Sequence, residues 1–254
     1  MAQKSDYIAV FDSGIGGISV LRELVRQMPN ERYLYYGDSA NAPYGTRPTQ
    51  QVRQLCLNVV EHLLDYGIKA LVIACNTATA AAIKELRSAY PELIIVGVEP
   101  ALKLAAARHP GGTVGVIATP VTLREEKFRQ LKDRCSDACR VITLPAPGLA
   151  DLVEAGKANS PESEALLQTL LAPHRDKLDA LVLGCTHYPF AAPTIGSVLG
   201  SRTELLDGGE GTARETRHRL QEANLLSDGP GDIQILSSSG DPAMVQRSWE
   251  LLRG

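Results

Sequence analysis

Two segments of the chain have nearly the same pattern. Residues 71–77 read Leu-Val-Ile-Ala-Cys-Asn-Thr, and residues 181–187 read Leu-Val-Leu-Gly-Cys-Thr-His. In each, an apolar run typical of a buried parallel strand ends at a small residue and a cysteine, and side chains that can cap a helix follow. Ligands bind at this end of a strand in an open α/β sheet, and a helix N-terminus there favours a thiolate. Cys75 and Cys185 therefore indicate chemistry that needs one group on each side of a substrate.

The surrounding sequence indicates internal duplication. Residues 7–11 lead into Asp12-Ser13-Gly14, and residues 113–117 lead into Ala118-Thr119-Pro120, with Asp12 and Thr119 separated by 107 positions and the two cysteines by 110. This spacing predicts two α/β domains related by a pseudo-twofold, with the active site in the cleft between them. The alternative is that βαβ units resemble one another and that small cysteines are often buried only for packing.

Strands are expected near residues 7–11, 32–36, 70–74, 93–98, 113–118, 140–144, 179–183, 204–206 and 232–236, and amphipathic helix-length stretches separate most of them. This alternation predicts doubly wound parallel sheets. We expect a first domain at 1–97 plus 208–254 and a second at 98–207. Ser160-Pro161-Glu162 has the pattern of a helix start, and residues 145–159 read as a long connection with a short helix that includes Glu154.

Composition fits a metabolic enzyme better than a nucleic-acid-binding protein. The 254 residues are 44% hydrophobic and carry a net charge of −3, so the chain can bury one large core or two modest ones and lacks a basic excess. We expect a small-molecule partner, no nucleic acid and no membrane. The chain has no apolar run that could span a bilayer, and its first residues lack a signal-peptide core, which predicts a cytoplasmic protein.

Five cysteines do not indicate a disulfide framework. Cys56, Cys135 and Cys139 fall in helix-like stretches and are interpreted as packing or surface residues. The spacing of Cys135 and Cys139 could in principle bind a metal, but no second pair completes a tetrahedral set, so no metal site is predicted.

Two loops follow the first two expected strands. The loop 12–17, Asp-Ser-Gly-Ile-Gly-Gly, lacks the glycine spacing of a dinucleotide site and has no phosphate-binding lysine motif. Its glycines still let the backbone approach a small anion, and Asp12 could hold an ammonium group or influence a thiol, although a helix cap is the alternative. The loop 37–45 could bind a carboxylate through backbone donors at the same sheet edge, or be a plain surface loop.

Four motifs together resemble the glutamate racemases of the aspartate/glutamate racemase family. They are Asp12-Ser-Gly-Ile-Gly-Gly17, Asp38-Ser-Ala-Asn-Ala-Pro-Tyr-Gly45, Ala74-Cys-Asn-Thr-Ala78 and Gly184-Cys-Thr-His-Tyr-Pro189. The resemblance extends from about residue 7 to the end and keeps the order of the motifs. It implies a cofactor-independent isomerase that interconverts L- and D-glutamate, supplies D-glutamate for peptidoglycan biosynthesis, and acts in the cytoplasm as a homodimer in cell-wall biogenesis and cell shape.

The resemblance also implies roles for individual residues. Cys75 and Cys185 become the two catalytic acid/bases, Asp12 assists the first thiol, and His187 with Glu154 assists the second. The residues implied to bind the amino acid are Asp12, Ser13, Pro43, Tyr44, Gly45, Asn76, Thr77, Thr119, Thr122, Thr186 and His187. Inversion at Cα explains the need for two thiols independently, because a proton leaves one face and another arrives on the opposite face. No pyridoxal-binding lysine motif is evident, so no cofactor is expected.

The sequence departs from the family pattern at some positions. Arg124 and Phe128 stand where a serine and a tyrosine are usual, and Asp207-Gly208-Gly209 is a looser match to which no role is assigned. The chain begins a few residues before its first strand, so we expect no N-terminal extension of the kind linked to activation by a cell-wall precursor.

Three alternatives remain open at this point. Aspartate racemases, hydantoin racemases and maleate isomerases are similar in fold and share paired cysteines, although Pro43-Tyr44-Gly45 and the segment 185–189 favour glutamate. A thiol redox or metal-binding protein would need a disulfide or a metal, and the chain has no Cys-x-x-Cys motif. A non-enzymatic amino-acid-binding protein would leave the two cysteines unexplained.

Overall fold

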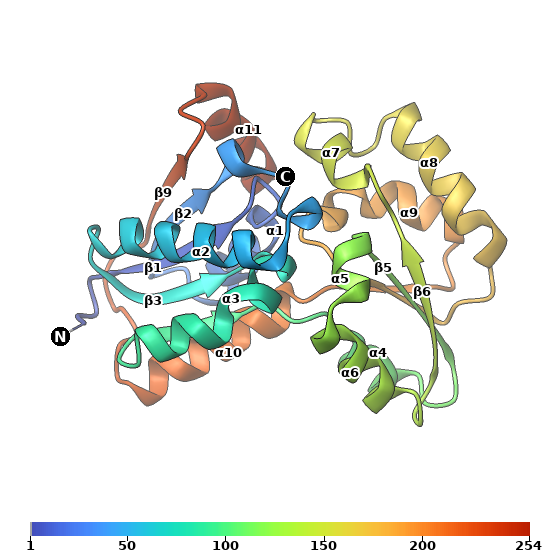
Figure 1. Cartoon of the computed structure of the whole chain (residues 1–254), viewed down its shortest axis with the longest axis horizontal. Helices are drawn as coiled ribbons and strands as arrows, with labels where there is room; N and C mark the ends of the chain where they lie inside the picture. Colours follow the sequence, from blue (N-terminus) through green and yellow to red (C-terminus); the bar gives the residue numbers. More distant parts are fainter. Residues whose placement is uncertain (1) are drawn as a thin grey trace. The chain divides into compact units, whose positions relative to one another are not determined.

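The structure is a computed structural model that describes residues 2–254. It divides into two compact units, residues 2–99 with 209–254 and residues 100–208 (Figure 1). The second unit is therefore inserted into the sequence of the first. Each unit has its own parallel sheet and its own core, and each is described separately below.

The first unit contains five strands in one sheet, sheet A, whose order is β4-β3-β1-β2-β9. Its elements are β1 (Tyr7–Asp12), α1 (Ile18–Gln27), β2 (Arg32–Gly37), the 3-10 turns η1 (Ser39–Asn41) and η2 (Tyr44–Thr46), α2 (Thr49–Leu64), β3 (Ile68–Ile73), α3 (Asn76–Ala89), β4 (Ile94–Gly97), α10 (Gly209–Glu222), β9 (Asp232–Ser237) and α11 (Pro242–Arg253). All pairings are parallel, so the carboxyl ends of the strands share one edge.

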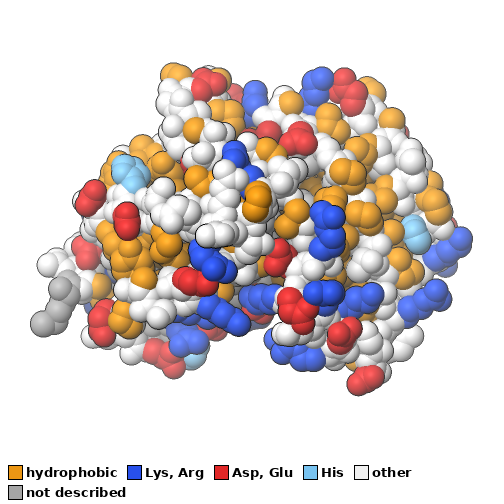
Figure 2. Space-filling view, viewed as in Figure 1, with side chains coloured by type: hydrophobic (Ala, Val, Ile, Leu, Met, Phe, Trp, Pro, Cys, Tyr) orange, Lys and Arg blue, Asp and Glu red, His pale blue; other side chains and the backbone are white. Residues whose placement is uncertain are grey.

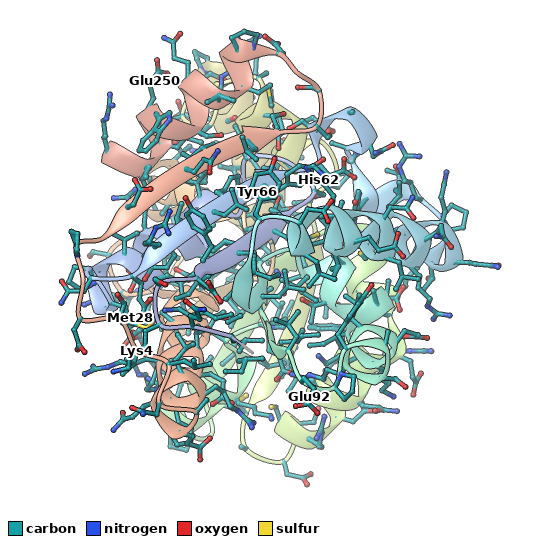
Figure 3. The ribbon with its side chains drawn as sticks, turned by 90° about the vertical axis from the view of Figure 1, so that its left-hand side faces the viewer. Lys4, Met28, His62, Tyr66, Glu92 and Glu250 are labelled. Atoms are coloured by element: carbon teal, nitrogen blue, oxygen red, sulfur yellow. The ribbon has the colours of Figure 1, made fainter. Side chains whose placement is uncertain are left out.

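Helices cover the central strands of sheet A. Figure 1 shows α2 and α3 over the strands, and residues such as Val60, Leu63 and Leu86 from these helices pack on Leu71 and Ile73 of β3 in one core. Every residue of β3 is buried, as expected for a strand with helices on both faces. The ring of His62 in α2 packs edge-on against that of Tyr66, two residues after the helix ends, with centroids 5.4 Å apart (Figure 3).

The second unit contains four parallel strands in sheet B, with the order β6-β5-β7-β8. Its elements are α4 (Leu102–Arg108), β5 (Thr113–Ala118), α5 (Pro120–Arg124), α6 (Glu126–Cys135), β6 (Arg140–Pro145), α7 (Leu149–Glu154), α8 (Pro161–Leu171), η3 (Ala172–His174), β7 (Ala180–Leu183), η4 (Tyr188–Ala191), α9 (Ala192–Leu199) and β8 (Glu204–Leu206).

Both faces of sheet B are covered. Leu181 and Leu183 of β7 pack with α8 and α9 on one face, while Ala180 and Val182 pack with α4 and α6 on the other. This alternation follows from the period-2 geometry of a strand. The result is a doubly wound sheet, so the predicted fold class of two parallel-sheet α/β domains is confirmed.

The nine predicted strands all occur, with starts and ends within two residues of those expected. Ser160 caps α8 by accepting a hydrogen bond from the backbone N–H of Ser163 at 3.3 Å, and the short α7 ends at Glu154. One expectation is wrong: Cys139 lies outside a helix, in the bend between α6 and β6, although Cys56, Cys135 and Cys139 are all buried.

Charged side chains of both signs are interspersed on the face of the molecule shown in Figure 2. This distribution agrees with the small net charge of the sequence. None of the helices within residues 2–254 combines the length and apolar character that a bilayer span requires.

Candidate active site

Cys75 connects β3 to α3. It is 5% exposed and occupies the N-cap position of α3, where its Sγ accepts a hydrogen bond from the backbone N–H of Ala78 at 3.4 Å. The apolar residues of β3 end at Ala74, and the 14-residue helix α3 begins directly after Cys75. A helix N-terminus carries partial positive charge and unpaired N–H groups, so this position stabilises a thiolate.

Asp12 ends the neighbouring strand β1 at the same edge, and Ser13 follows it. Ser13 Oγ lies 3.6 Å from Cys75 Sγ, and Asp12 Oδ1 accepts a hydrogen bond from Gly14 N at 2.9 Å. The backbone of this edge is joined by a hydrogen bond from Ala74 N to Phe11 O at 2.8 Å. The structure therefore places the Ser13 hydroxyl beside the first predicted thiol and Asp12 at the same sheet edge.

Gly17 allows this close arrangement. A Cβ atom at Gly17 would lie 2.6 Å from Asp12 Cβ and 3.0 Å from Ala74 Cβ, closer than side chains pack. The loop between β1 and α1 thus requires glycine at position 17, because Asp12 and Ala74 approach its backbone too closely for a Cβ atom. This close approach explains the glycine without any phosphate-binding role.

The loop after β2 carries Pro43, Tyr44 and Gly45. Tyr44 is buried, its ring packs edge-on against Phe11 with centroids 6.2 Å apart, and its hydroxyl donates to Asp38 Oδ2 at 2.6 Å. Burial raises the pKa of Tyr44 and its hydrogen bond to Asp38 raises it further, so the phenol stays protonated. Because β1 pairs with β2 in parallel, this loop starts at the same sheet edge as Asp12.

Asn76 and Thr77 form the first turn of α3. Thr77 is buried, and Asn76 Oδ1 is a buried acceptor without a hydrogen-bond partner among residues 2–254. Buried polar atoms are normally paired, so an acceptor left open at this edge can receive a donor from a ligand. An α-ammonium group is one such donor.

The second unit places Cys185, His187 and Glu154 in a chain of contacts. Cys185 Sγ lies 3.5 Å from His187 Nδ1, and His187 Nε2 lies 2.6 Å from Glu154 Oε1. His187 is 6% exposed, and Glu154 reaches it from the end of α7, 33 residues earlier in sequence. The arrangement is that of a thiol with an adjacent imidazole, which is oriented in turn by a carboxylate.

His187 has a perturbed pKa. Burial lowers the pKa of His187, but hydrogen bonds to Cys185 and Glu154 and the charges of both groups outweigh burial and raise it well above its ordinary value. An imidazolium here donates both ring N–H groups, one toward Cys185 and one toward Glu154. The positive charge of the imidazolium therefore lies next to the Cys185 sulfur.

One expectation about Cys185 is wrong. An α-helix does not begin directly after it: the segment contains Pro189 and forms the 3-10 turn η4, and α9 begins only at Ala192, with Pro193 in its first turn. Cys185 therefore lacks the α-helix N-terminus that Cys75 has. His187 takes the place of the helix dipole as the nearby positive group.

Thr119, Thr122 and Thr186 lie at the same edge of sheet B as Cys185. Thr119 caps α5, its Oγ1 lies 3.0 Å from Thr122 Oγ1, and Gly184 N donates to Ile117 O, which joins the ends of β5 and β7. Thr186 is buried next to Cys185. Each unit thus brings its own predicted residues together at one sheet edge.

Sequence reasoning assigned no role to Asp38, although it lies in a recognised motif. Asp38 is 2% exposed and receives the Tyr44 hydroxyl at the same sheet edge. An acidic residue directly after an expected buried strand was the available signal. As for metals, no group of three or more His, Cys, Asp or Glu side chains within residues 2–254 is arranged to hold an ion.

Comparison with known proteins identifies the family to which the chain belongs. The family model described as Asp/Glu/Hydantoin racemase matches residues 8–216. The chain belongs to the Asp/Glu/Hydantoin racemase family. Together with full-length relatives that are glutamate racemases, membership supports an amino-acid racemase, and therefore an isomerase.

Relatives in this family match over the full length. The chain is 46% identical to the glutamate racemase of Ectopseudomonas mendocina, with 100% of this chain and 97% of that protein covered, and 45% identical to the glutamate racemase of Clostridium perfringens strain SM101, with 98% and 97% covered. Among solved structures, Escherichia coli glutamate racemase in complex with L-glutamate and the activator UDP-MurNAc-ala aligns with a TM-score of 0.86 at 29% identity, covering 98% of this chain and 94% of that one.

Proposed function

We propose that the protein interconverts L- and D-glutamate through two cysteine acid/bases, Cys75 and Cys185. The observation that carries this proposal is the paired placement of the thiols: each follows a central strand at the carboxyl edge of its own sheet, and each has a group that stabilises a thiolate. Substrate identity is supported by the full-length relatives, which are glutamate racemases.

The reaction moves one proton off Cα and another onto it. In the direction from L- to D-glutamate, the Cys185 thiolate removes the Cα proton and becomes a thiol, and the electron pair of the C–H bond passes into a planar carbanion. The Cys75 thiol then donates its proton to the opposite face and becomes a thiolate. Atoms and charge balance, and the reverse direction exchanges the two roles.

Different groups stabilise the thiolate forms of the two cysteines in this scheme. His187, oriented by Glu154, stabilises the thiolate of Cys185, while the Ala78 N–H and the start of α3 stabilise that of Cys75. We propose that Asp12 assists Cys75, and that Ser13, Pro43, Tyr44, Gly45, Thr119, Thr122 and Thr186 bind the amino acid. Asn76 and Thr77 complete this set.

The weakly acidic Cα–H needs stabilisation of the carbanion. Donors that neutralise the α-carboxylate in a site closed to water supply this, because electrostatic interactions strengthen when water is excluded. The N–H groups in the first turn of α3 and the buried hydroxyls of Thr77 and Thr186 are such donors. No cofactor is required in this scheme.

Circular dichroism of L-glutamate incubated with the protein tests the activity directly. After dialysis against a chelator and with no pyridoxal phosphate, we expect the signal to decay to zero. Aspartate should be a poor substrate because its side chain is one methylene shorter. Activity that depends on added metal or pyridoxal phosphate, or comparable kcat/KM for the two amino acids, would contradict the proposal.

Deuterium incorporation tests the two-base mechanism. In D2O, the first D-glutamate formed from L-glutamate should carry deuterium delivered by Cys75, while unreacted L-glutamate stays largely protiated. Replacement of either cysteine by alanine should abolish racemisation, with a loss exceeding the ~10²- to 10⁴-fold usual for one general acid or base. Equal early deuteration of substrate and product would rule out two separate thiols.

We also propose a cellular context that follows from the resemblance and from the relatives. The product D-glutamate would serve peptidoglycan biosynthesis in the cytoplasm, and the protein would act as a homodimer. Depletion of the protein in its host should create a requirement for D-glutamate. Light scattering should give about twice the chain mass of 27.3 kDa, and a mass of one chain at all working concentrations would exclude the dimer.

A further inference from the structure

We infer that Asp38 is a positioning residue that fixes the loop 39–47 in its substrate-binding conformation. Its buried carboxylate does so by accepting hydrogen bonds from Tyr44 and Asn41. This inference rests on the proposed function, because Tyr44 and Gly45 of that loop are proposed to bind glutamate. It adds a residue to which neither the motif pattern nor the family resemblance assigned a role.

The contacts of Asp38 connect the loop to the sheet. Its Oδ2 accepts the Tyr44 hydroxyl at 2.6 Å, and Asn41 Nδ2 lies 3.0 Å from Oδ1 and 3.1 Å from Oδ2. Its own backbone N–H donates to Asp12 O at 2.9 Å. One side chain thus joins two positions of the loop, and its backbone is tied to the residue proposed to assist Cys75.

The carboxylate is buried and its partners are neutral. Asp38 is 2% exposed, and the two buried ion pairs in the described part of the chain, Lys69 with Glu31 and His187 with Glu154, do not include it. A buried carboxylate costs free energy unless donors surround it, and hydrogen bonds to a charged acceptor are stronger than neutral ones. The hydroxyl and amide of the loop therefore bind tightly to this charge.

The loop contains no α-helix or strand, only the two three-residue 3-10 turns η1 and η2. Besides Asp38, its hydrogen bonds include Ala40 N to Ser238 Oγ at 3.0 Å and Arg47 Nε to Asn41 O at 2.8 Å. The Tyr44 ring is buried in the core of the first unit and packs edge-on against Phe11. The bond from its hydroxyl to Asp38 adds a directional contact at the far end of the ring, and so positions the adjoining peptide groups of Tyr44 and Gly45.

The test compares Asp38→Asn with Tyr44→Phe and with a matched control. D38N replaces one acceptor oxygen by an amide donor that faces the donors of Tyr44 and Asn41, and Y44F removes the hydroxyl but keeps the packed ring. Glu31→Gln is the control: Glu31 is also 2% exposed, directly precedes β2 at the end of the strand opposite Asp38, and contacts Lys69 and Ser227 N rather than the loop.

We expect D38N and Y44F each to raise KM for both glutamate enantiomers about tenfold, as for loss of one charge-assisted hydrogen bond used in binding, with kcat changed less than about threefold. The double variant should raise KM no further than the worse single variant, because both remove the same interaction. E31Q should lower the urea midpoint of unfolding and leave KM unchanged.

Three results would overturn the inference. They are an unchanged KM in Y44F, an additive double variant, or an increase in KM for E31Q as large as that for D38N, which would show that any loosening of β2 has the same effect. If D38N does not fold, the KM of Y44F decides alone. A wild-type protein that cannot racemise glutamate overturns the proposed function together with this inference, whereas an active wild type with any of the three results overturns the inference alone.

Discussion

At the residue scale, the two proposed acid/bases differ in what stabilises their thiolates. Cys75 has a backbone N–H and the start of a 14-residue helix, neither of which can lose a proton at ordinary pH. Cys185 has His187, whose charge depends on pH and on Glu154. The pH dependence of the reaction should therefore arise mainly in the second unit.

Replacing Glu154 by Gln should lower the pKa of His187 toward its ordinary value, because an amide cannot stabilise the imidazolium by charge. Nitrogen-detected NMR titration, with His187→Asn to assign the signal, would measure this. We expect His187 to stay protonated above neutrality in the wild type and to titrate at lower pH in E154Q. An unchanged pKa would show that Glu154 does not orient a charged imidazole.

The pair formed by His187 and Glu154 should also make the stability of the protein depend on pH. Because the pKa of His187 is higher in the folded state than in the unfolded state, its protonation adds stability that is fully present below about pH 6.5 and is lost as the pH rises through the folded-state value. Urea unfolding of wild type and E154Q should therefore differ most in mildly acidic buffer. A difference in unfolding free energy between wild type and E154Q that grows toward alkaline pH would contradict this prediction.

Residues beside a recognisable strand end could be predicted from sequence, and those held only by tertiary contacts could not. Cys75, Cys185 and His187 follow apolar runs that mark the sheet edge. By contrast, the contact between Glu154 and His187 joins residues 33 positions apart, and Glu154 was identified only through the family resemblance. The position of Asp38 directly after a strand could be predicted, but its contacts with Tyr44 and Asn41 depend on how the loop folds back.

At the element scale, the helices after the two cysteines begin differently, and sequence reasoning missed this. Both motifs have capping side chains after the cysteine, but Pro189 and Pro193 favour a 3-10 turn and a delayed helix start after Cys185. Strand β3 also begins earlier than expected, because Lys69 is buried there by its pairing with Glu31 at 2.6 Å. A lysine gives no such signal in an isolated sequence.

Gly17→Ala should destabilise the first unit and impair activity. The added methyl group would overlap Asp12 Cβ at 2.6 Å, so α1 or the β1 edge must shift, at a cost of ~1–3 kcal/mol. Urea unfolding would measure the loss, and kcat/KM should fall with it because Asp12 moves. Full activity with wild-type stability would show that the close approach at Gly17 is unimportant.

Gly196→Ala is the matched substitution, and we expect it to stabilise the protein rather than destabilise it. Gly196 lies inside α9, where an added Cβ meets nothing within 4 Å, and alanine is the better helix former. We expect the free energy of unfolding to rise by ~0.5–1 kcal/mol without a change in kcat. A destabilised G196A would mean that α9 needs the flexibility of glycine.

At the scale of the whole molecule, the two units repeat one arrangement. In sheet A, β1 pairs with β3 through Phe11 and Ile73, two residues before Cys75. In sheet B, β5 pairs with β7 through Ile117 and Leu183, two residues before Cys185. The cysteines therefore occupy the same register in the two sheets, which is the structural counterpart of the internal duplication seen in the sequence.

This duplication leads to a prediction for the intact protein. If one glutamate molecule meets both thiols, saturating D-glutamate should slow alkylation of Cys75 and Cys185 together, although they belong to different units. Peptide mass spectrometry after iodoacetamide treatment would follow each cysteine separately. Cys56 is the internal control, because it is fully buried in the first unit and burial raises its thiol pKa, so it should react slowly with or without ligand. Protection of only one of the two catalytic candidates would contradict a mechanism in which a single substrate lies between two bases, and it would leave the other thiol without a role in the reaction.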